Sequence, residues 1–347
     1  MSEDQLYFVQ ASNDLSAEET QKIIDDIFKG VKTDELKHRS LSRRPAGQER
    51  VVEFVTWAAK NPKRVAVWVA HKEYAMLTFI VEWWIEPLAY KGGLNLYKDG
   101  GNQAMANMLF MCLQGFWDEK FRRKVLLAFQ IMFRSRTRER YDECEKLIAK
   151  TRASVMLDEV RSEIIRYLWV SFSTLGHSHV VGVPPHVLDL ALPGLVRLGH
   201  KWRAQHEGPW EVVHDRSTNM VKQKWMWDKL SGTDLAPAQF DGPHGVSIFP
   251  MNVLTTRFAD SIAEKQIQLC DVLAGATAAS IRLPEDDKYR KKLVDAGILN
   301  LIIDTIWPTD AVTPEELGKK GWDGNEALDY ISEAIAKKDA AAARRAQ

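Results

Sequence analysis

The chain has 347 residues, 45% of them hydrophobic, and its 47 basic and 47 acidic side chains cancel at pH 7. This length suffices for one large or two ordinary domains. The balanced charge excludes a global field that would draw the protein onto nucleic acid or anionic lipid. Three cysteines without metal-ligand spacing favour a reducing compartment, and no apolar stretch is long enough to span a bilayer. We therefore expect a cytoplasmic protein with no membrane role.

The first predicted elements are a strand and two helices. Residues 6–11 are apolar and aromatic and are followed by polar residues, a pattern typical of a strand. Ser16 and Glu19 then have the spacing of a capping box, which predicts the start of a helix. A second helix is predicted over residues 46–60 and must end there, because the residue before Pro62 is pushed out of helical geometry.

The clearest strand lies at residues 64–72. Its centre is apolar on both faces, which predicts a central position in a covered sheet. His71 and Lys72 follow at its C-terminal end, where open α/β sheets place their ligands. From Tyr74 to about Gln205 the pattern is nearly all helical, so we expect a long helical insertion after this strand.

Two further strands are predicted at residues 210–215 and 252–259, and each leads into an acid, Asp215 and Asp260 respectively. From Gln268 onward apolar residues recur at helical spacing, so a core-facing helix is expected with Asp271 near its start. An acid at that position is either stabilised by the helix dipole or held there to bind a cation.

These acids and Glu35 are expected to converge at strand ends and at a helix start. Carboxylates that gather in one place repel each other, and a divalent cation such as Mg²⁺ or Mn²⁺ is the usual remedy. A pair of such cations activates water during phosphodiester cleavage. We therefore expect a metal site whose ligands are Glu35, Asp215, Asp271 and, more weakly, Asp260, with Lys37, His71, Lys72 and Gln268 orienting phosphate or water.

In order and residue type, the same segments resemble the domain of unknown function 3800 family. The resemblance covers essentially the whole chain and is carried by residues 7–15, 35–37, 65–72, 213–217 and 258–275. The last segment is the most specific. The family ends its domain with an aspartate-serine pair and then a glutamine-leucine-alanine-aspartate helix, and this chain has Cys270 in the alanine place. The resemblance implies a ribonuclease H-like fold, a mixed sheet flanked by helices, with metal-dependent nuclease chemistry.

One part of the family pattern is missing from this chain. Family members begin with a strand that carries an aspartate-glutamate-serine-glycine motif, and nothing ahead of Leu6 matches it. In the ribonuclease H topology that strand is central and brings the main metal-binding aspartate. Three explanations stay open: the chain starts at an internal methionine of a longer protein with more residues upstream of Met1, a partner supplies the strand, or the sheet closes over the gap in an inactive relative.

The expected organisation is an α/β core over residues 1–73 and 207–282, enlarged by a helical insertion over 74–206. C-terminal helices over 283–338 and a disordered tail over 339–347 follow. Two functions stay open. One is a divalent-metal-dependent nuclease acting on a nucleic acid substrate. The other is a non-catalytic protein- or nucleic-acid-binding module of the same fold, in which a partner protein or a second copy completes the sheet.

Overall fold

The computed structural model describes residues 5–31, 33–184, 186–242, 245–324, 329–333, 336–337 and 340. The chain forms two compact units. An α/β unit is built mainly from Tyr7–Ala70 and Leu190–Thr305, and a helical unit is built mainly from His71–Asp189 and Ile306–Tyr330. The mixed α/β class agrees with the expectation from sequence.

The strands form three small sheets. One has the order β1-β2-β7, the second is the parallel pair β3-β6, and the third is the antiparallel pair β4-β5. The bounds of the strands are Tyr7–Asn13 for β1, Val65–His71 for β2, Trp210–Asp215 for β3, Ala238–Gly242 for β4, Gly245–Phe249 for β5, Val253–Ala259 for β6 and Ile302–Ile306 for β7.

The predicted strands β1, β2, β3 and β6 are all present, and all seven residues of β2 are buried between β1 and β7. Strands β4, β5 and β7 were not predicted. The prediction that residues 283–338 are helical was therefore wrong at β7, a short run of β-branched residues that helical periodicity does not separate from its neighbours. The predicted tail, residues 339–347, lies outside the described residues apart from Ala340.

The helices of the α/β unit begin with α1, whose capping box forms as predicted: the Glu19 N–H donates to the Ser16 hydroxyl and the Ser16 N–H to the Glu19 carboxylate. Their bounds are Ala17–Ile27 for α1, His38–Leu41 for α2, Pro45–Lys60 for α3, Ala191–Gln205 for α11, Thr218–Ser231 for α12, Lys265–Arg282 for α13 and Lys288–Asp295 for α14, followed by the 3₁₀ turn η3 at Ile298–Leu301.

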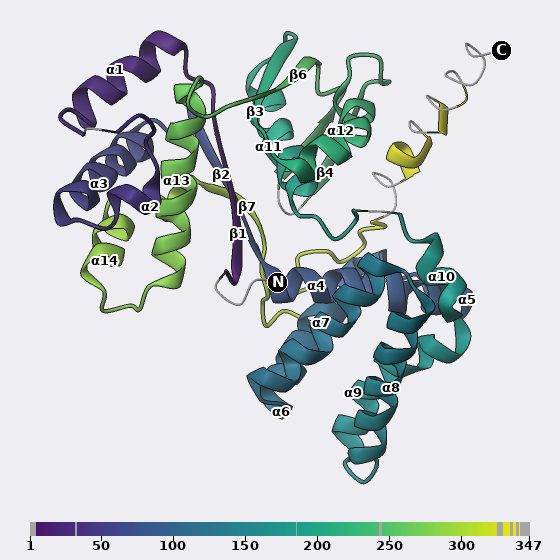
Figure 1. The fold of residues 1–347 in the computed structure, drawn as a ribbon. Helices are drawn as coiled ribbons and strands as arrows, with labels where there is room; N and C mark the ends of the chain where they lie inside the picture. Colours follow the sequence, from purple (N-terminus) through teal and green to yellow (C-terminus); the bar gives the residue numbers. More distant parts are fainter. Residues whose placement is uncertain are drawn as a thin grey trace. The chain divides into compact units, whose positions relative to one another are not determined.

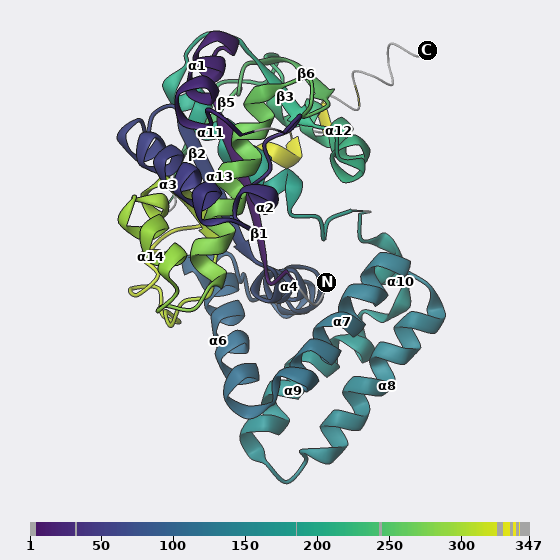
Figure 2. The same ribbon diagram turned by 60° about the vertical axis from the view of Figure 1, so that its left-hand side comes forward.

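Helices α11 and α13 cover opposite faces of β1. Helix α13 runs alongside β1 in both ribbon views (Figures 1 and 2). Asn13 donates its amide to the Cys270 sulfur of α13 at 2.9 Å, whereas the Trp202 indole of α11 donates to the Ser12 hydroxyl at 2.9 Å. Because neighbouring residues of a strand point to opposite faces, the two helices sandwich this strand.

The helical unit confirms the predicted helical character after residue 74. Its elements are α4 (Lys72–Ile80), the π-helix η1 (Val81–Ile85), α5 (Glu86–Lys91), the 3₁₀ turn η2 (Lys98–Gly100), α6 (Gly101–Phe116), α7 (Glu119–Ser135), α8 (Arg138–Ser154), α9 (Glu159–Thr174) and α10 (Gly176–Gly182). The buried Trp84 ring lies at the centre of its core, 4.7 Å from the Phe172 ring. Helix α11, expected inside the insertion over 74–206, belongs instead to the α/β unit. None of the described helices is long and apolar enough to cross a membrane.

Candidate functional site

The carboxylate of Glu35 lies in the turn before α2 and is bonded on both oxygens. Lys37 Nζ lies 2.8 Å from Oε2, and the Ser261 hydroxyl donates to Oε1. The Lys37 ammonium, and to a lesser degree the Ser261 hydroxyl, lowers the pKa of Glu35, although partial burial opposes this shift. Only 17% of the Glu35 side chain is exposed. Glu35 is thus a charged group whose counter-charge is supplied by a residue two positions away.

Asp271 of α13 and Asp215 at the end of β3 lie in the same electrostatic neighbourhood. The Asp271 Oδ2 atom accepts the His38 N–H at 3.2 Å. Although one side of Asp271 faces solvent, surrounding protein raises its pKa, and the Glu35 and Asp215 charges add to this rise. The pKa of Lys37 is raised, mainly by Glu35 and to a smaller extent by the charges of Asp271 and Asp215. Three of the four predicted acids therefore act electrostatically on the same lysine.

Gln268 holds two backbone segments against α13. Its buried amide accepts the Leu36 N–H at 2.9 Å through Oε1 and donates to the Ser261 carbonyl at 2.7 Å through Nε2. Leu36 lies between Glu35 and Lys37, so this clamp positions the ion pair. Gln268 was expected to orient phosphate or water, but both ends of its amide are engaged with backbone.

The fourth predicted ligand, Asp260, has a local structural role. Its exposed carboxylate accepts the Ile262 N–H at 2.9 Å, which stabilises the turn before α13. Among the contacts of the acids, the hydroxyl of Ser261 and the N–H of His38 were not predicted. The aspartate-serine pair at 260–261 was noted as a motif, but only the fold shows that its serine contacts Glu35.

His71 and Lys72 belong to the helical unit, whereas the predicted acids belong to the α/β unit. His71 caps α4, because its Nδ1 accepts the Tyr74 N–H at 3.3 Å, and its ring packs edge-on against the Phe110 and Trp307 rings. Burial lowers the pKa of His71 to about 4 and also lowers the pKa of Lys72. His71 thus has a structural role, as the N-cap of α4 and as part of an aromatic cluster.

The donors around Lys37 do not fit a divalent cation as they are arranged. Within the part of the chain that the structure describes, no three His, Cys, Asp or Glu side chains are grouped so that they could hold a metal ion. The Lys37 ammonium instead supplies positive charge beside Glu35. A cation would have to displace this ammonium from Glu35 before the carboxylate could bind it.

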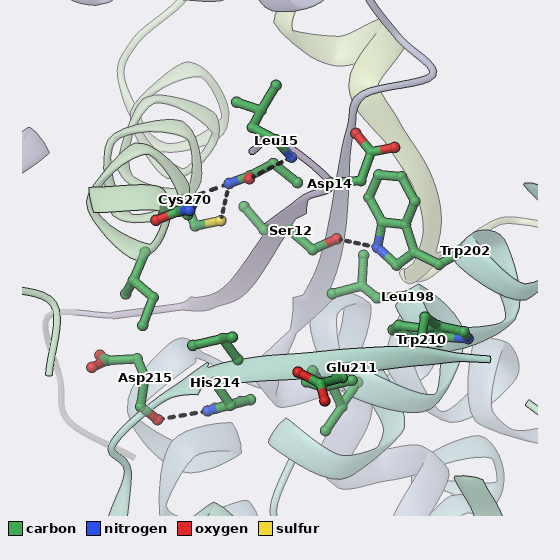
Figure 3. Close-up of a pocket in the computed structure, with 18 of the residues that line it drawn as sticks. Ser12, Asp14, Leu15, Leu198, Trp202, Trp210, Glu211, His214, Asp215 and Cys270 are labelled. Atoms are coloured by element: carbon green, nitrogen blue, oxygen red, sulfur yellow. Dashed lines mark hydrogen bonds between the residues drawn. The ribbon is translucent and has the colours of Figure 1, made fainter. Parts of the chain in front are cut away.

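A pocket of about 510 Å³ opens between β1 and β3 (Figure 3). Residues 10–15 form one wall and residues 210–215 the other. Helix α11 contributes Leu195, Leu198 and Trp202, and α13 contributes Ile267 and Cys270. Of the predicted acids, Asp215 lines this pocket. The sequence patterns did not predict the pocket.

Gln10 and His214 connect the two walls of the pocket. Their Nε2 atoms lie 3.4 Å apart, and His214 Nδ1 donates to the Asp215 carbonyl at 2.6 Å, so His214 Nε2 accepts from the Gln10 amide. Burial lowers the pKa of His214, which favours this neutral form. The Oε1 atom of Gln10 is buried and has no hydrogen-bond partner.

Several other polar groups of the pocket have partners. Asp14 pairs with Arg64 at 2.6 Å, and Arg257 pairs with Glu264 at 2.7 Å. Burial raises the pKa of Cys270 to about 12, so its thiol stays protonated and is a poor nucleophile. Among the described residues of this lining, no three His, Cys, Asp or Glu side chains are grouped so that they could hold a metal ion.

No protein-family model, no curated protein and no solved structure matches this chain. The resemblance to the domain of unknown function 3800 family therefore stays a prediction that is carried by the residues alone.

Proposed function

We propose that this chain is a non-catalytic module of ribonuclease H-like type that binds a partner protein. The observation that carries the proposal is the pocket between β1 and β3, which has a strand on each side and a helix above and below. Its volume lies within the roughly 300–1,000 Å³ of pockets that take specific ligands. The parallel pair β3-β6 and the helices on both faces of β1 support the fold assignment, although the strands form three small sheets instead of one.

The state of Glu35 argues against catalysis by the acids. A divalent cation binds carboxylate oxygens that are free to coordinate it, but the Glu35 oxygens are bonded to Lys37 and Ser261. The Lys37 ammonium already balances the charge of Glu35.

The charge of the pocket favours protein over nucleic acid as the partner. Asp215 lines one end of the pocket, and its charge acts together with those of Glu35 and Asp271 on a single ammonium, that of Lys37, so that negative charges outnumber positive ones in this group. Nucleic acid binding depends on the neutralisation of phosphates by lysine and arginine, so this end would repel a phosphate backbone. The apolar helix residues of the lining suit side chains of a polypeptide.

Titration with MnCl₂ in a calorimeter, together with a cleavage assay on labelled single-stranded RNA and duplex DNA, tests the absence of catalysis. The full chain is expected to give no binding heat at millimolar Mn²⁺ and no cleavage. Tight Mn²⁺ binding that disappears in Asp271→Ala, accompanied by cleavage, would reject the module and establish an enzyme.

A second candidate is a nuclease that uses Mg²⁺ or Mn²⁺, and one observation favours it. Glu35, Asp215 and Asp271 do lie in one electrostatic neighbourhood, although they are far apart in the sequence. If this arrangement is a metal site held closed by Lys37, then Lys37→Met should bind Mn²⁺ while the unaltered chain does not. A Lys37→Met variant that also fails to bind Mn²⁺ removes this candidate.

A further inference from the structure

We propose that the pocket between β1 and β3 receives an extended segment of the partner polypeptide as an added strand, parallel to β3 and antiparallel to β1, with a basic side chain beside Asp215. The inference rests on the proposed binding function and specifies the form and chemistry of the ligand. Strand addition of this kind uses backbone hydrogen bonds for affinity and alternate side chains for specificity.

Both walls of the pocket are unpaired strand edges. Strand β1 ends the order β1-β2-β7 and β3 ends the pair β3-β6, so among the described residues each has one neighbour only. The Asp14 N–H donates to the Arg64 carbonyl next to β2. Because backbone groups alternate in direction along a strand, Ala11 and Asn13 direct their N–H and C=O groups toward the pocket.

The same alternation fixes the outward groups of β3. The Arg216 N–H donates to the Ala259 carbonyl of β6 at 3.1 Å. Val213 and Asp215 therefore direct their backbone groups away from β6 and toward the pocket, where the Asp215 carbonyl accepts from His214 Nδ1. An extended segment between the two strands would meet the backbone groups of Ala11 and Asn13 on one side, and those of Val213 and the Asp215 N–H on the other.

The edge strand β1 is more exposed to solvent than the central strand β2. Every residue of β2 is buried, but every residue of β1 is only partly buried. Helices contact both faces of β1, so the difference arises at the edge that faces the pocket. An added strand would cover this edge as β1 and β7 cover the edges of β2.

The directions of the two walls suit a single strand. Gln10 of β1 contacts His214 near the end of β3, whereas Asp14 lies 3.4 Å from His206, just before β3 begins. Strands β1 and β3 therefore run antiparallel to each other. One inserted strand that is parallel to β3 is necessarily antiparallel to β1, and both are standard ladders.

The faces of the pocket specify the alternate side chains of the ligand. Leu195, Leu198 and Trp202 line the face formed by α11, and that face suits apolar side chains. The face formed by α13 presents Cys270 and Asn13, which suit small polar side chains. We therefore expect a segment in which apolar and small polar residues alternate.

Charge specifies one end of the ligand. Two other acids of the lining are paired, Asp14 with Arg64 and Glu264 with Arg257, and the exposed Glu211 lies at the opposite end, where β3 begins. Where β3 finishes, the charges of Asp215, Asp271 and Glu35 all act on Lys37. A strand parallel to β3 has its C-terminal end beside Asp215, so a lysine or arginine there complements the excess negative charge.

The probe for the test is an acetylated and amidated octapeptide in which valine and serine alternate, with lysine in place of the last serine. Binding to the full chain is measured by calorimetry. We expect micromolar affinity and at least about tenfold weaker binding when either the valine or the serine nitrogens are methylated, because each set of N–H groups faces one wall. Replacement of the lysine by aspartate should also weaken binding.

Amide hydrogen exchange locates the bound peptide. The amides of Ala11, Asn13, Val213 and Asp215 should exchange more slowly in the complex, while those of β2 should not change. Val213→Pro, which removes a donor that faces the pocket, should abolish binding, and Val213→Ala is its matched control. If Val213→Pro fails to fold, the inference is still tested by comparing the parent and methylated peptides on the unaltered protein.

Two results would overturn the inference: no binding of the parent octapeptide at millimolar concentration, or equal binding of the parent and methylated peptides. The latter would show that the pocket takes side chains without forming a ladder. Failure of the proposed function is recognised separately, because Mn²⁺ binding and cleavage by the chain without peptide would reject the module whatever the peptide does.

Discussion

The Nε2 atoms of Gln10 and His214 lie 3.4 Å apart, so β1 and β3 are joined at this point by side chains and not by a backbone ladder. The contact leaves the Gln10 Oε1 atom buried without a partner. A buried unsatisfied polar atom costs about 1–3 kcal/mol. The side-chain contact is thus a weak substitute for the strand pairing that surrounds β2 on both sides.

Gln10→Leu should leave the free energy of unfolding within about 1 kcal/mol of the unaltered chain, because the lost hydrogen bond and the removed orphan oxygen offset each other. The same change should strengthen binding of the octapeptide, since no amide has to be displaced from His214. Chemical denaturation and calorimetry measure the two effects. Gln21→Leu on α1, outside the pocket lining, is the control, and weaker peptide binding by Gln10→Leu would contradict this account.

Lys37→Met should lower stability at neutral pH, because Glu35 loses the ammonium that lowers its pKa. A carboxylate with a lowered folded-state pKa stabilises the fold above its unfolded pKa, and this contribution is lost as the pH falls through the folded value. The difference between the variant and the unaltered chain should therefore shrink on acidification below about pH 4.5. Lys37→Arg should retain most of the stability, whereas equal stability of Lys37→Met at pH 7 would refute the role of the ion pair.

Glu19→Gln should show the same sign of pH dependence over a wider range. The Arg64 guanidinium, with help from the Ser16 N–H, lowers the pKa of Glu19 to about 2. Its contribution is thus present above pH 4.5 and fades as the pH falls toward 2. Because 44% of the Glu19 side chain is exposed, solvent screening reduces the expected loss at pH 7 to about 1 kcal/mol. Thermal unfolding between pH 2 and 7 measures it, with Glu18→Gln as the control, and a loss that is constant with pH would exclude the ion pair as its cause.

Gly275→Ala should destabilise the α/β unit by about 1–3 kcal/mol. A Cβ atom at this position of α13 would lie 2.3 Å from the His38 Cβ atom, so α2 or α13 would have to shift. The matched change is Gly115→Ala in α6, where nothing lies within 4 Å of an added Cβ and alanine should stabilise the helix by about 0.5–1 kcal/mol. Denaturant unfolding of both variants compares them, and a neutral Gly275→Ala would show that the helices tolerate separation.

Several elements of the fold could be predicted from local residues. The capping box at Ser16, the buried strand β2 and the helix that carries Asp271 depend on patterns within a few residues, and the structure has all of them. Strand β7 was missed for the opposite reason. Its residues Ile302–Ile306 become a strand by pairing with β2, which lies far earlier in the chain, and no local pattern records that pairing.

For the candidate site, too, some features could be predicted from the sequence and others could not. Glu35, Asp215 and Asp271 were selected from the sequence, together with Asp260, by their positions at predicted strand ends and at a predicted helix start. Only the tertiary structure decided that Lys37 pairs with Glu35, that Gln268 is held by backbone, and that β1 and β3 leave an open pocket between them. Sequence patterns determine which groups are charged or buried locally, whereas the contacts of those groups depend on the path of the whole chain.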